Sequence, residues 1–218
     1  MEVRKEYIED LKKLKKDVQR MGELAKESAG NAIKALVQRD MELSSKIIKE
    51  NNRIDKLEFD IEKNCIRLLA LQQPMAVDLR TIETCMKIIT DFDRISDLAG
   101  DIAEIVQRMA NESFAKPLID IPRMSEISQG MISDCLLAFS SGDIKMLGDI
   151  SARDDLLDGL FDQIRRELLT IMIEDPKCIS NASNLTFVAL HLERIGDHAC
   201  NIAGRVIYMV TGERIKLG

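Results

Sequence analysis

Two groups of residues, all acidic except Asn201, lie a hundred positions apart and have a spacing that suits cation binding. In each group the members are four residues apart: Asp93, Asp97 and Asp101 in the first, and Glu193, Asp197 and Asn201 in the second. In a helix this spacing stacks the side chains along one face. Like charges stacked in this way cost about 0.2–0.5 kcal/mol per pair, and a bound cation would offset that repulsion. We take the six residues as the primary candidate metal ligands.

The neighbours of these acids favour a binding site over a solvated helix face. Small residues stand beside them, namely Ser96 and Gly100 in the first group and Gly196 and Cys200 in the second. Small side chains allow another helix, an ion or a ligand to approach closely. The alternative is a structural network in which Arg94 and Arg194 pair with the acids.

Further oxygen donors come from earlier in each half of the chain. They are secondary candidates for the same sites: Asn31 and Asp55 in the first half, and Asp134 and Asp158 in the second. Taken singly, Asn31 and Asp55 are better explained as structural polar residues. Carboxylates and amides together suit hard or borderline cations, such as Mg²⁺, Ca²⁺, Mn²⁺ or iron, and suit thiolate-seeking metals poorly.

The elements that position these residues are predicted to be helices. The chain has 4% aromatic and 31% charged residues, and good helix formers dominate it. The four prolines fall in three gaps, and Asp40 and Asp143 are expected to cap helices that follow further breaks. Together these signals predict an all-α protein with six helices, at about 5–38, 41–72, 77–111, 123–140, 144–174 and 178–212.

The second half of the chain repeats the first. A shift of 103 residues aligns Asp40 with Asp143, and a shift of 100 aligns FDRISDLAGDIAE (92–104) with LERIGDHACNIAG (192–204). A repeat of this length predicts two tandem three-helix bundles. We expect them at 1–112 and 123–218, joined by a proline-containing connector at 113–122.

Charge and cysteine content limit the function classes. The formal charge of −6 argues against a nucleic-acid partner, since phosphate binding relies on clustered Lys and Arg. Five widely spaced cysteines indicate a reducing compartment rather than a disulfide framework. The charged N-terminus does not resemble a signal peptide, and no apolar run reaches the length of a transmembrane helix. A soluble cytoplasmic protein is therefore expected.

The paired D/E-R-I-x-D-x-A-x-x-I helices, together with Pro74-Met-Ala-Val-Asp-Leu-Arg80, closely resemble the PhoU family over nearly the whole chain. This resemblance implies two tandem three-helix bundles. It also implies multinuclear metal binding through E/D-x-x-x-D motifs, which fall here at Asp93/Asp97 and Glu193/Asp197. Asp93 and Ser96 depart from the commoner Glu and Gly of the motif, so the second site matches the family better.

The resemblance further implies a cytoplasmic regulator without enzymatic activity. It would restrain the phosphate-starvation response and tune high-affinity phosphate uptake. Its partners would be the ATPase of the phosphate ABC transporter and a sensor histidine kinase, through which it would reach the membrane only peripherally. A homo-oligomer, most simply a dimer, is expected.

Two other classes remain open at this point. One is a di-iron or ferritin-like protein, but neither His191 nor His198 stands three residues after a Glu, as that class requires. The other is a helical scaffold in which the acids serve solubility. Glycine-rich phosphate loops are absent from the sequence, which argues against an ATPase.

Overall fold

Six long α-helices run through the residues that the structure, a computed structural model, describes, namely 2–72, 74–110 and 112–217. They are α1 (Glu2–Gln38), α2 (Met41–Gln72), α3 (Ala76–Arg108), α4 (Asp120–Ser141), α5 (Ile150–Glu174) and α6 (Ile179–Thr211). Two short 3-10 helices, Ile144–Leu147 and Pro176–Cys178, precede α5 and α6. The all-α prediction with six helices is confirmed.

Aspartate caps mark the starts of α2 and α5. Asp40 accepts a hydrogen bond from the backbone N–H of Leu43 at 2.9 Å, as a residue that caps α2 should. Asp143 caps only the 3-10 helix, and α5 begins six residues later than predicted. Its cap is Asp149, which accepts from the N–H of Ala152 at 3.3 Å. The delay arises at Gly148, whose φ of 57° interrupts the helix.

The segment between the third and fourth helices lies a few residues earlier than the predicted connector at 113–122. Helix α4 already begins at Asp120, so Pro122 lies in its first turn, where a missing N–H leaves no hydrogen bond unmade. Helix α3 ends at Arg108, before the predicted 111, and Asn111 lies outside the described residues.

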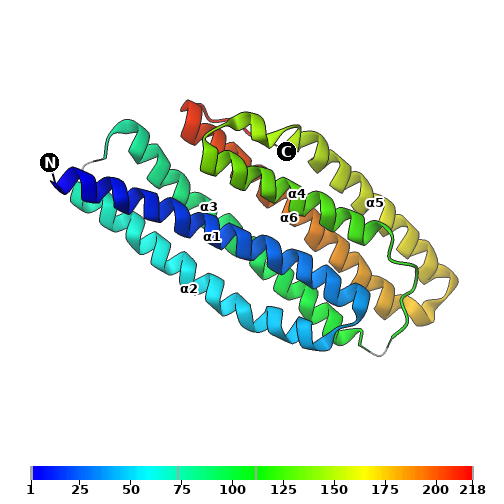
Figure 1. Ribbon diagram of the computed structural model, residues 1–218. Helices are drawn as coiled ribbons and strands as arrows, with labels where there is room; N and C mark the ends of the chain where they lie inside the picture. The colour runs from blue at the N-terminus through cyan, green and yellow to red at the C-terminus, as the bar shows by residue number, and fades with distance from the viewer. Residues whose placement is uncertain (1, 73, 111, 218) are drawn as a thin grey trace.

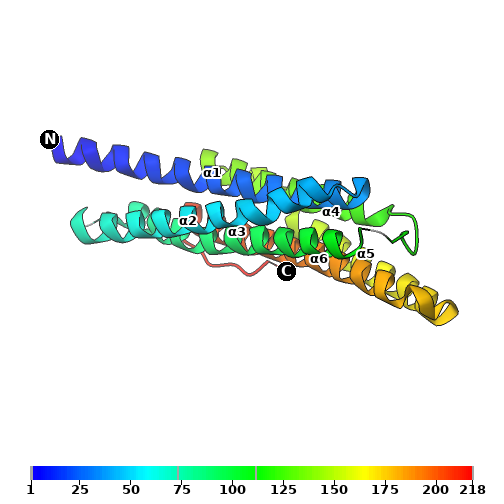
Figure 2. The ribbon, with the colours of Figure 1, turned by 90° about the horizontal axis from the view of Figure 1, so that it is seen from below.

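The helices form two three-helix bundles that pack side by side (Figure 1). Helices α3 and α6 run antiparallel along the seam between the bundles, with α2 flanking α3 and α5 flanking α6. Helices α1 and α4 contact each other and cover one side of the seam (Figure 2). The opposite side of the α3–α6 seam is left uncovered by α1 and α4, and the candidates Asp97, Asp101, Asp197 and Asn201 lie there.

Close packing where the bundles meet requires a glycine on α1. A Cβ at Gly22 would lie 2.5 Å from Leu136 Cδ2 and 2.7 Å from Phe92 Cζ. Both Leu136 and Phe92 are buried, so neither side chain has free space to move into. Gly22 therefore allows α1 to approach α3 and α4 together.

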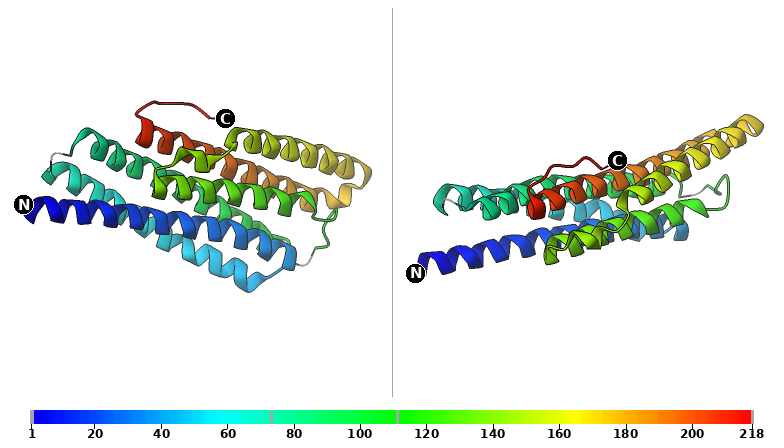
Figure 3. Two further views of the ribbon diagram at one scale, coloured as in Figure 1. Left: turned by 45° about the horizontal axis from the view of Figure 1, so that its top comes forward. Right: turned by 90° about the horizontal axis from the view of Figure 1, so that it is seen from above.

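The chain beyond α6 turns back along that helix (Figure 3). Gly212, with a φ of 82°, makes the turn. Arg214 Nη2 then pairs with Glu83 Oε1 of α3 at 3.2 Å, and Leu217 packs against the core. The segment Gly212–Leu217 is called the C-terminal segment below. None of the helices in the described ranges combines the length and apolarity needed to cross a membrane.

Candidate metal centres

The first acidic site comprises four carboxylates on α2 and α3. They are Asp55 and Glu58 on α2, and Asp93 and Asp97 on α3. Burial, followed by the neighbouring charges of Glu58, Asp97 and Asp55, raises the pKa of Asp93 to about 6. The site therefore concentrates negative charge that the nearby Arg94 compensates only in part.

Asn51 braces the first acidic site. Its Nδ2 donates to Asp97 Oδ1 at 2.9 Å, while its Oδ1 accepts a hydrogen bond from the Ser96 hydroxyl. Arg94 Nη1 reaches the other oxygen of Asp97 at 3.1 Å. Both oxygens of Asp97 thus have partners within the protein, and a neutral amide links α2 to α3.

The second acidic site repeats this arrangement on α5 and α6. It comprises Asp154 and Asp158 on α5, and Glu193 and Asp197 on α6. Burial and the charges of Asp197 and Asp158 raise the pKa of Glu193 to about 7. The pKa values of Asp154 and Asp158 are also raised, first by burial and then by Asp197.

A furrow of about 610 Å³ runs along the α3–α6 seam next to both sites. Asp97 and Asp197 line it, as do the two outer members of the primary candidates, Asp101 and Asn201. Arg94 and Arg194 also line this furrow. Asp101 and Asn201 therefore face the seam between the bundles rather than the α2–α3 and α5–α6 interfaces.

The two histidines also belong to the seam. His198 Nδ1 lies 2.9 Å from Asp91 Oδ1 of α3, which joins the two bundles. The Nδ1 of His191 is buried without a hydrogen-bond partner among the described residues, and burial lowers its pKa. Neither histidine is among the neighbours that shift the carboxylates of the acidic sites.

Two of the secondary candidates lie away from the acidic sites. Asn31 lines a separate cavity of about 200 Å³ between α1 and α2, together with Glu50 and Arg53. Asp134 forms an ion pair with Arg153 at 2.7 Å, so a basic side chain already compensates its charge. Asp55 and Asp158, by contrast, lie where the repeat predicts them.

Sequence reasoning missed Asp154 and Glu58. A signal for Asp154 was present, because Asp154 and Asp158 are four residues apart and the shift of 103 residues places Asp154 on Asn51. Glu58 had no such signal, since the same shift places it on Phe161.

The donor chemistry of both acidic sites fits a hard or borderline cation. Each site gathers several carboxylates, and the raised pKa values of Asp93 and Glu193 report charge that lacks full compensation. Across the described residues, however, no three Asp, Glu, His or Cys side chains are already grouped closely enough to hold an ion. The side chains are thus neighbours rather than a closed coordination shell.

The family model of the PhoU domain matches the chain twice, over residues 18–106 and 121–206. The "Phosphate-specific transport system accessory protein PhoU homolog" of Aquifex aeolicus is 41% identical, over 96% of this chain and 95% of that protein. The homolog of the same name from Clostridium acetobutylicum is 36% identical, over 98% of each chain.

Solved structures give the same result. The crystal structure of PhoU from Pseudomonas aeruginosa superposes with a TM-score of 0.90 at 32% identity, over 95% of this chain and 100% of that one. The phosphate transport system regulatory protein PhoU from Streptococcus pneumoniae reaches a TM-score of 0.89 at 28% identity. Both repeats, and nearly the full length, are shared, so the chain belongs to the PhoU family.

Proposed function

We propose that this protein is a cytoplasmic regulator of phosphate homeostasis that restrains the phosphate-starvation response and modulates a high-affinity phosphate ABC transporter. The observation that carries the proposal is the match of both repeats to the PhoU domain. Relatives that share nearly the full length are named accessory proteins of the phosphate-specific transport system.

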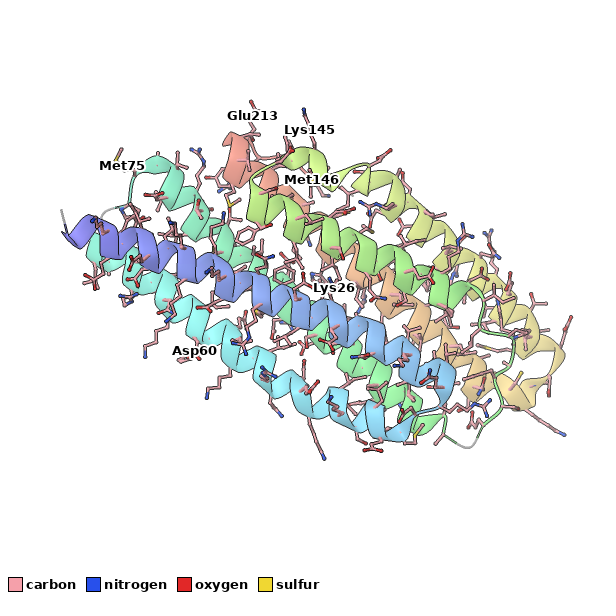
Figure 4. The ribbon with its side chains drawn as sticks, viewed as in Figure 1. Lys26, Asp60, Met75, Lys145, Met146 and Glu213 are labelled. Carbon is pink, nitrogen blue, oxygen red and sulfur yellow. The ribbon has the colours of Figure 1, made fainter. Side chains whose placement is uncertain are left out.

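The protein would work as an adaptor rather than as a catalyst. Its partners would be the transporter's ATPase and a sensor histidine kinase, with self-association as a dimer. Exposed apolar residues at the α2–α3 turn support a role in protein contacts. Leu71 is 68% exposed and Met75 is 73% exposed, and Met75 projects from one end of the molecule (Figure 4). Single exposed apolar residues are common, but several at one turn suit an interface.

Metal binding would belong to this adaptor role. Asp55, Asp93 and Asp97 would hold a cation at the first acidic site. Asp158, Glu193 and Asp197 would hold one at the second. When bound, a cation would neutralise the clustered carboxylates and tie α2 to α3 and α5 to α6. The carboxylates of this chain would then orient their helices without mutual repulsion.

The regulatory role is tested in a strain that lacks the gene and grows with ample phosphate. We expect high alkaline phosphatase activity and altered phosphate uptake, both restored to normal by the gene on a plasmid. Unchanged activity and uptake, in a strain without a second PhoU-family gene, would contradict the regulatory proposal.

The metal role is tested by the metal content of gently purified protein. We expect bound iron, Mn²⁺, Mg²⁺ or Ca²⁺, with a sharp loss in the double variant Asp97→Asn, Asp197→Asn. Asp60→Asn is the matched control, because Asp60 is an exposed acid on α2 that points outward (Figure 4). Equal metal content in the double variant and the wild type would remove these residues as ligands.

A further inference from the structure

A cavity near the end of α6 is lined by basic side chains. It has a volume of about 200 Å³ and lies between α6 and the C-terminal segment, which Figure 3 shows folded back along that helix. Three cationic residues line it, namely Arg205 of α6 and Arg214 and Lys216 of the C-terminal segment. No Asp or Glu is among the described residues of its wall. In a chain with a formal charge of −6, such a local excess of positive charge marks a candidate anion site.

The charges of this basic cavity are poorly compensated. Among the described residues, Arg205 and Lys216 take part in no ion pair. Arg214 does pair with Glu83 of α3 at 3.2 Å, but the two side chains are 69% and 36% exposed. An ion pair this open to solvent contributes little stability, so Arg214 can also bind an anion.

The rest of the wall suits an oxyanion. Tyr208 and Asn201 line the cavity, and both carry hydrogen-bond donors. The guanidinium of Arg214 lies over the ring of Tyr208, 5.1 Å from its centroid, which holds it beside the cavity. Cys200, also in the wall, has a neutral thiol, because burial and the charge of Asp154 raise its pKa to about 12. Planar guanidinium groups donate paired hydrogen bonds to the oxygens of an anion such as phosphate.

The C-terminal segment is held closely against α6. A Cβ at Gly204 would lie 3.2 Å from the backbone oxygen of Ile215, so the segment can approach this near because residue 204 has no side chain. Gly212, with a φ of 82°, makes the turn, and Leu217 packs against the core at the far end. This contact brings the two cations of the segment to the cavity that Arg205 lines.

We propose that the basic cavity binds a small oxyanion of the phosphate class, with Arg205, Arg214 and Lys216 as its cationic ligands. A dianion gains more from three cations than a single carboxylate does, and it would neutralise the positive charge of the cavity. Because the cations come from both α6 and the C-terminal segment, the bound anion would also fasten that segment to the helix. The inference goes beyond the proposed function, since it uses no carboxylate of the acidic sites and needs no metal ion.

The test is isothermal titration calorimetry of the full-length protein with inorganic phosphate, at low ionic strength and with a chelator that removes metal ions. We expect one phosphate to bind per chain. Its affinity should fall about tenfold or more in Arg205→Gln and in Lys216→Gln, because each change removes a charge-assisted hydrogen bond. Gly204→Leu should abolish binding without a change in charge, since its side chain enters the space between α6 and the C-terminal segment.

Glycerol 3-phosphate distinguishes the source of the phosphate group. If it binds more weakly than inorganic phosphate, the cavity takes the free ion. If it binds more tightly and is lost in the same variants, the cavity takes the phosphate group of a larger molecule. Both results support the oxyanion site.

Arg166→Gln is the matched control. Arg166 is an exposed arginine of α5 that pairs with Asp162 at 3.2 Å and does not line the cavity. Its loss changes the net charge as much as Arg205→Gln does, so this variant should bind phosphate like the wild type. Circular dichroism should show native helix content in every variant.

Absence of saturable phosphate binding by the wild type would overturn the proposal. Wild-type affinity in Arg205→Gln or in Gly204→Leu would overturn it too, because the phosphate would then bind elsewhere. Each of these results would leave the regulatory and metal proposals standing, since those depend on other residues and other measurements.

Discussion

The two acidic sites occupy equivalent positions in the repeat, but they neutralise charge differently. In the first, the amide of Asn51 bridges Ser96 and Asp97. In the second, Asp154 takes the place of Asn51 and brings another carboxylate near Asp197. Each site thus holds four carboxylates, but only in the first does an amide link Asp97 to the neighbouring helix. The two copies of a duplicated helix pair can thus share one geometry and still differ in the side chains that surround their carboxylates.

The packing between helices also differs between the two sites. Ser96 fits within the first bundle, where it is 1% exposed and donates to Asn51. Its counterpart, Gly196, leaves no such side chain in the second. A Cβ there would lie 2.5 Å from Leu157 Cδ1, and Leu157 is fully buried. The close approach of α5 to α6 replaces the hydrogen bond that joins α2 to α3.

Replacing a glycine by alanine should give the largest difference in stability between the two sites. Gly196→Ala should lower the free energy of unfolding by about 1–3 kcal/mol, because the new methyl group collides with Leu157 in a filled core. Gly100→Ala should instead raise it by about 0.5–1 kcal/mol, since no atom lies within 4 Å and alanine favours the helix. Urea denaturation measures both effects. A stabilising Gly196→Ala variant would show that α5 and α6 are not in close contact.

Exchanging Asn51 and Asp154 should make the sites more alike. In metal-free protein, Asn51→Asp should destabilise the fold by roughly 1–2 kcal/mol, because it replaces a hydrogen bond to Asp97 by repulsion. Asp154→Asn should instead stabilise the metal-free fold. Thermal unfolding in the presence of a chelator gives both values. If Asp154→Asn also destabilises the metal-free protein, the Asp154 charge has a compensating partner.

The smallest effect concerns pH. Glu193 ionises at a pKa of about 4.5 when unfolded and about 7 when folded. Its protonated form therefore stabilises the fold below about pH 4.5, and that contribution is lost as the pH rises to 7. Glu193→Gln should remove this loss of stability. It should raise the free energy of unfolding at pH 8 by about 1 kcal/mol, after allowance for solvent screening.

Asp93→Asn is the comparison for this pH effect. The pKa of Asp93 is about 6, so its contribution is lost by a lower pH than that of Glu193. The free energy of unfolding, measured from pH 4 to 8 in the presence of a chelator, should therefore still fall between pH 6 and 7 in Asp93→Asn. In Glu193→Gln this fall should be absent. Identical profiles for the two variants would mean that the sites hold equal charge.

The fold was more predictable than the sites. Proline positions, aspartate caps and the repeat identified six helices, because helix breaks are local features of the sequence. The late start of α5 depended on the left-handed conformation of Gly148, which no periodicity reveals. The repeat also placed Asp55 and Asp158 correctly next to the third helix of each bundle.

Residues that depend on a neighbour from another helix were predicted poorly. Asp134 matched the pattern of a ligand, but its partner Arg153 lies on another helix, and residue spacing within one helix does not reveal such a contact. Asn31 faces α2 from α1, away from the acidic site. Asp154 was hidden because its counterpart Asn51 is uncharged, so a search for duplicated acids passes over both.

The antiparallel seam between α3 and α6 also sets an order of folding during synthesis. Contacts within each bundle join helices that are close in sequence, so the first bundle can form as soon as α3 leaves the ribosome. The side of α3 that carries Thr84 and Asp91 must then wait for Arg205 and His198, more than a hundred residues later. Until α6 is made, the side of α3 that α6 later covers stays exposed, and chaperones or other nascent chains can bind to it.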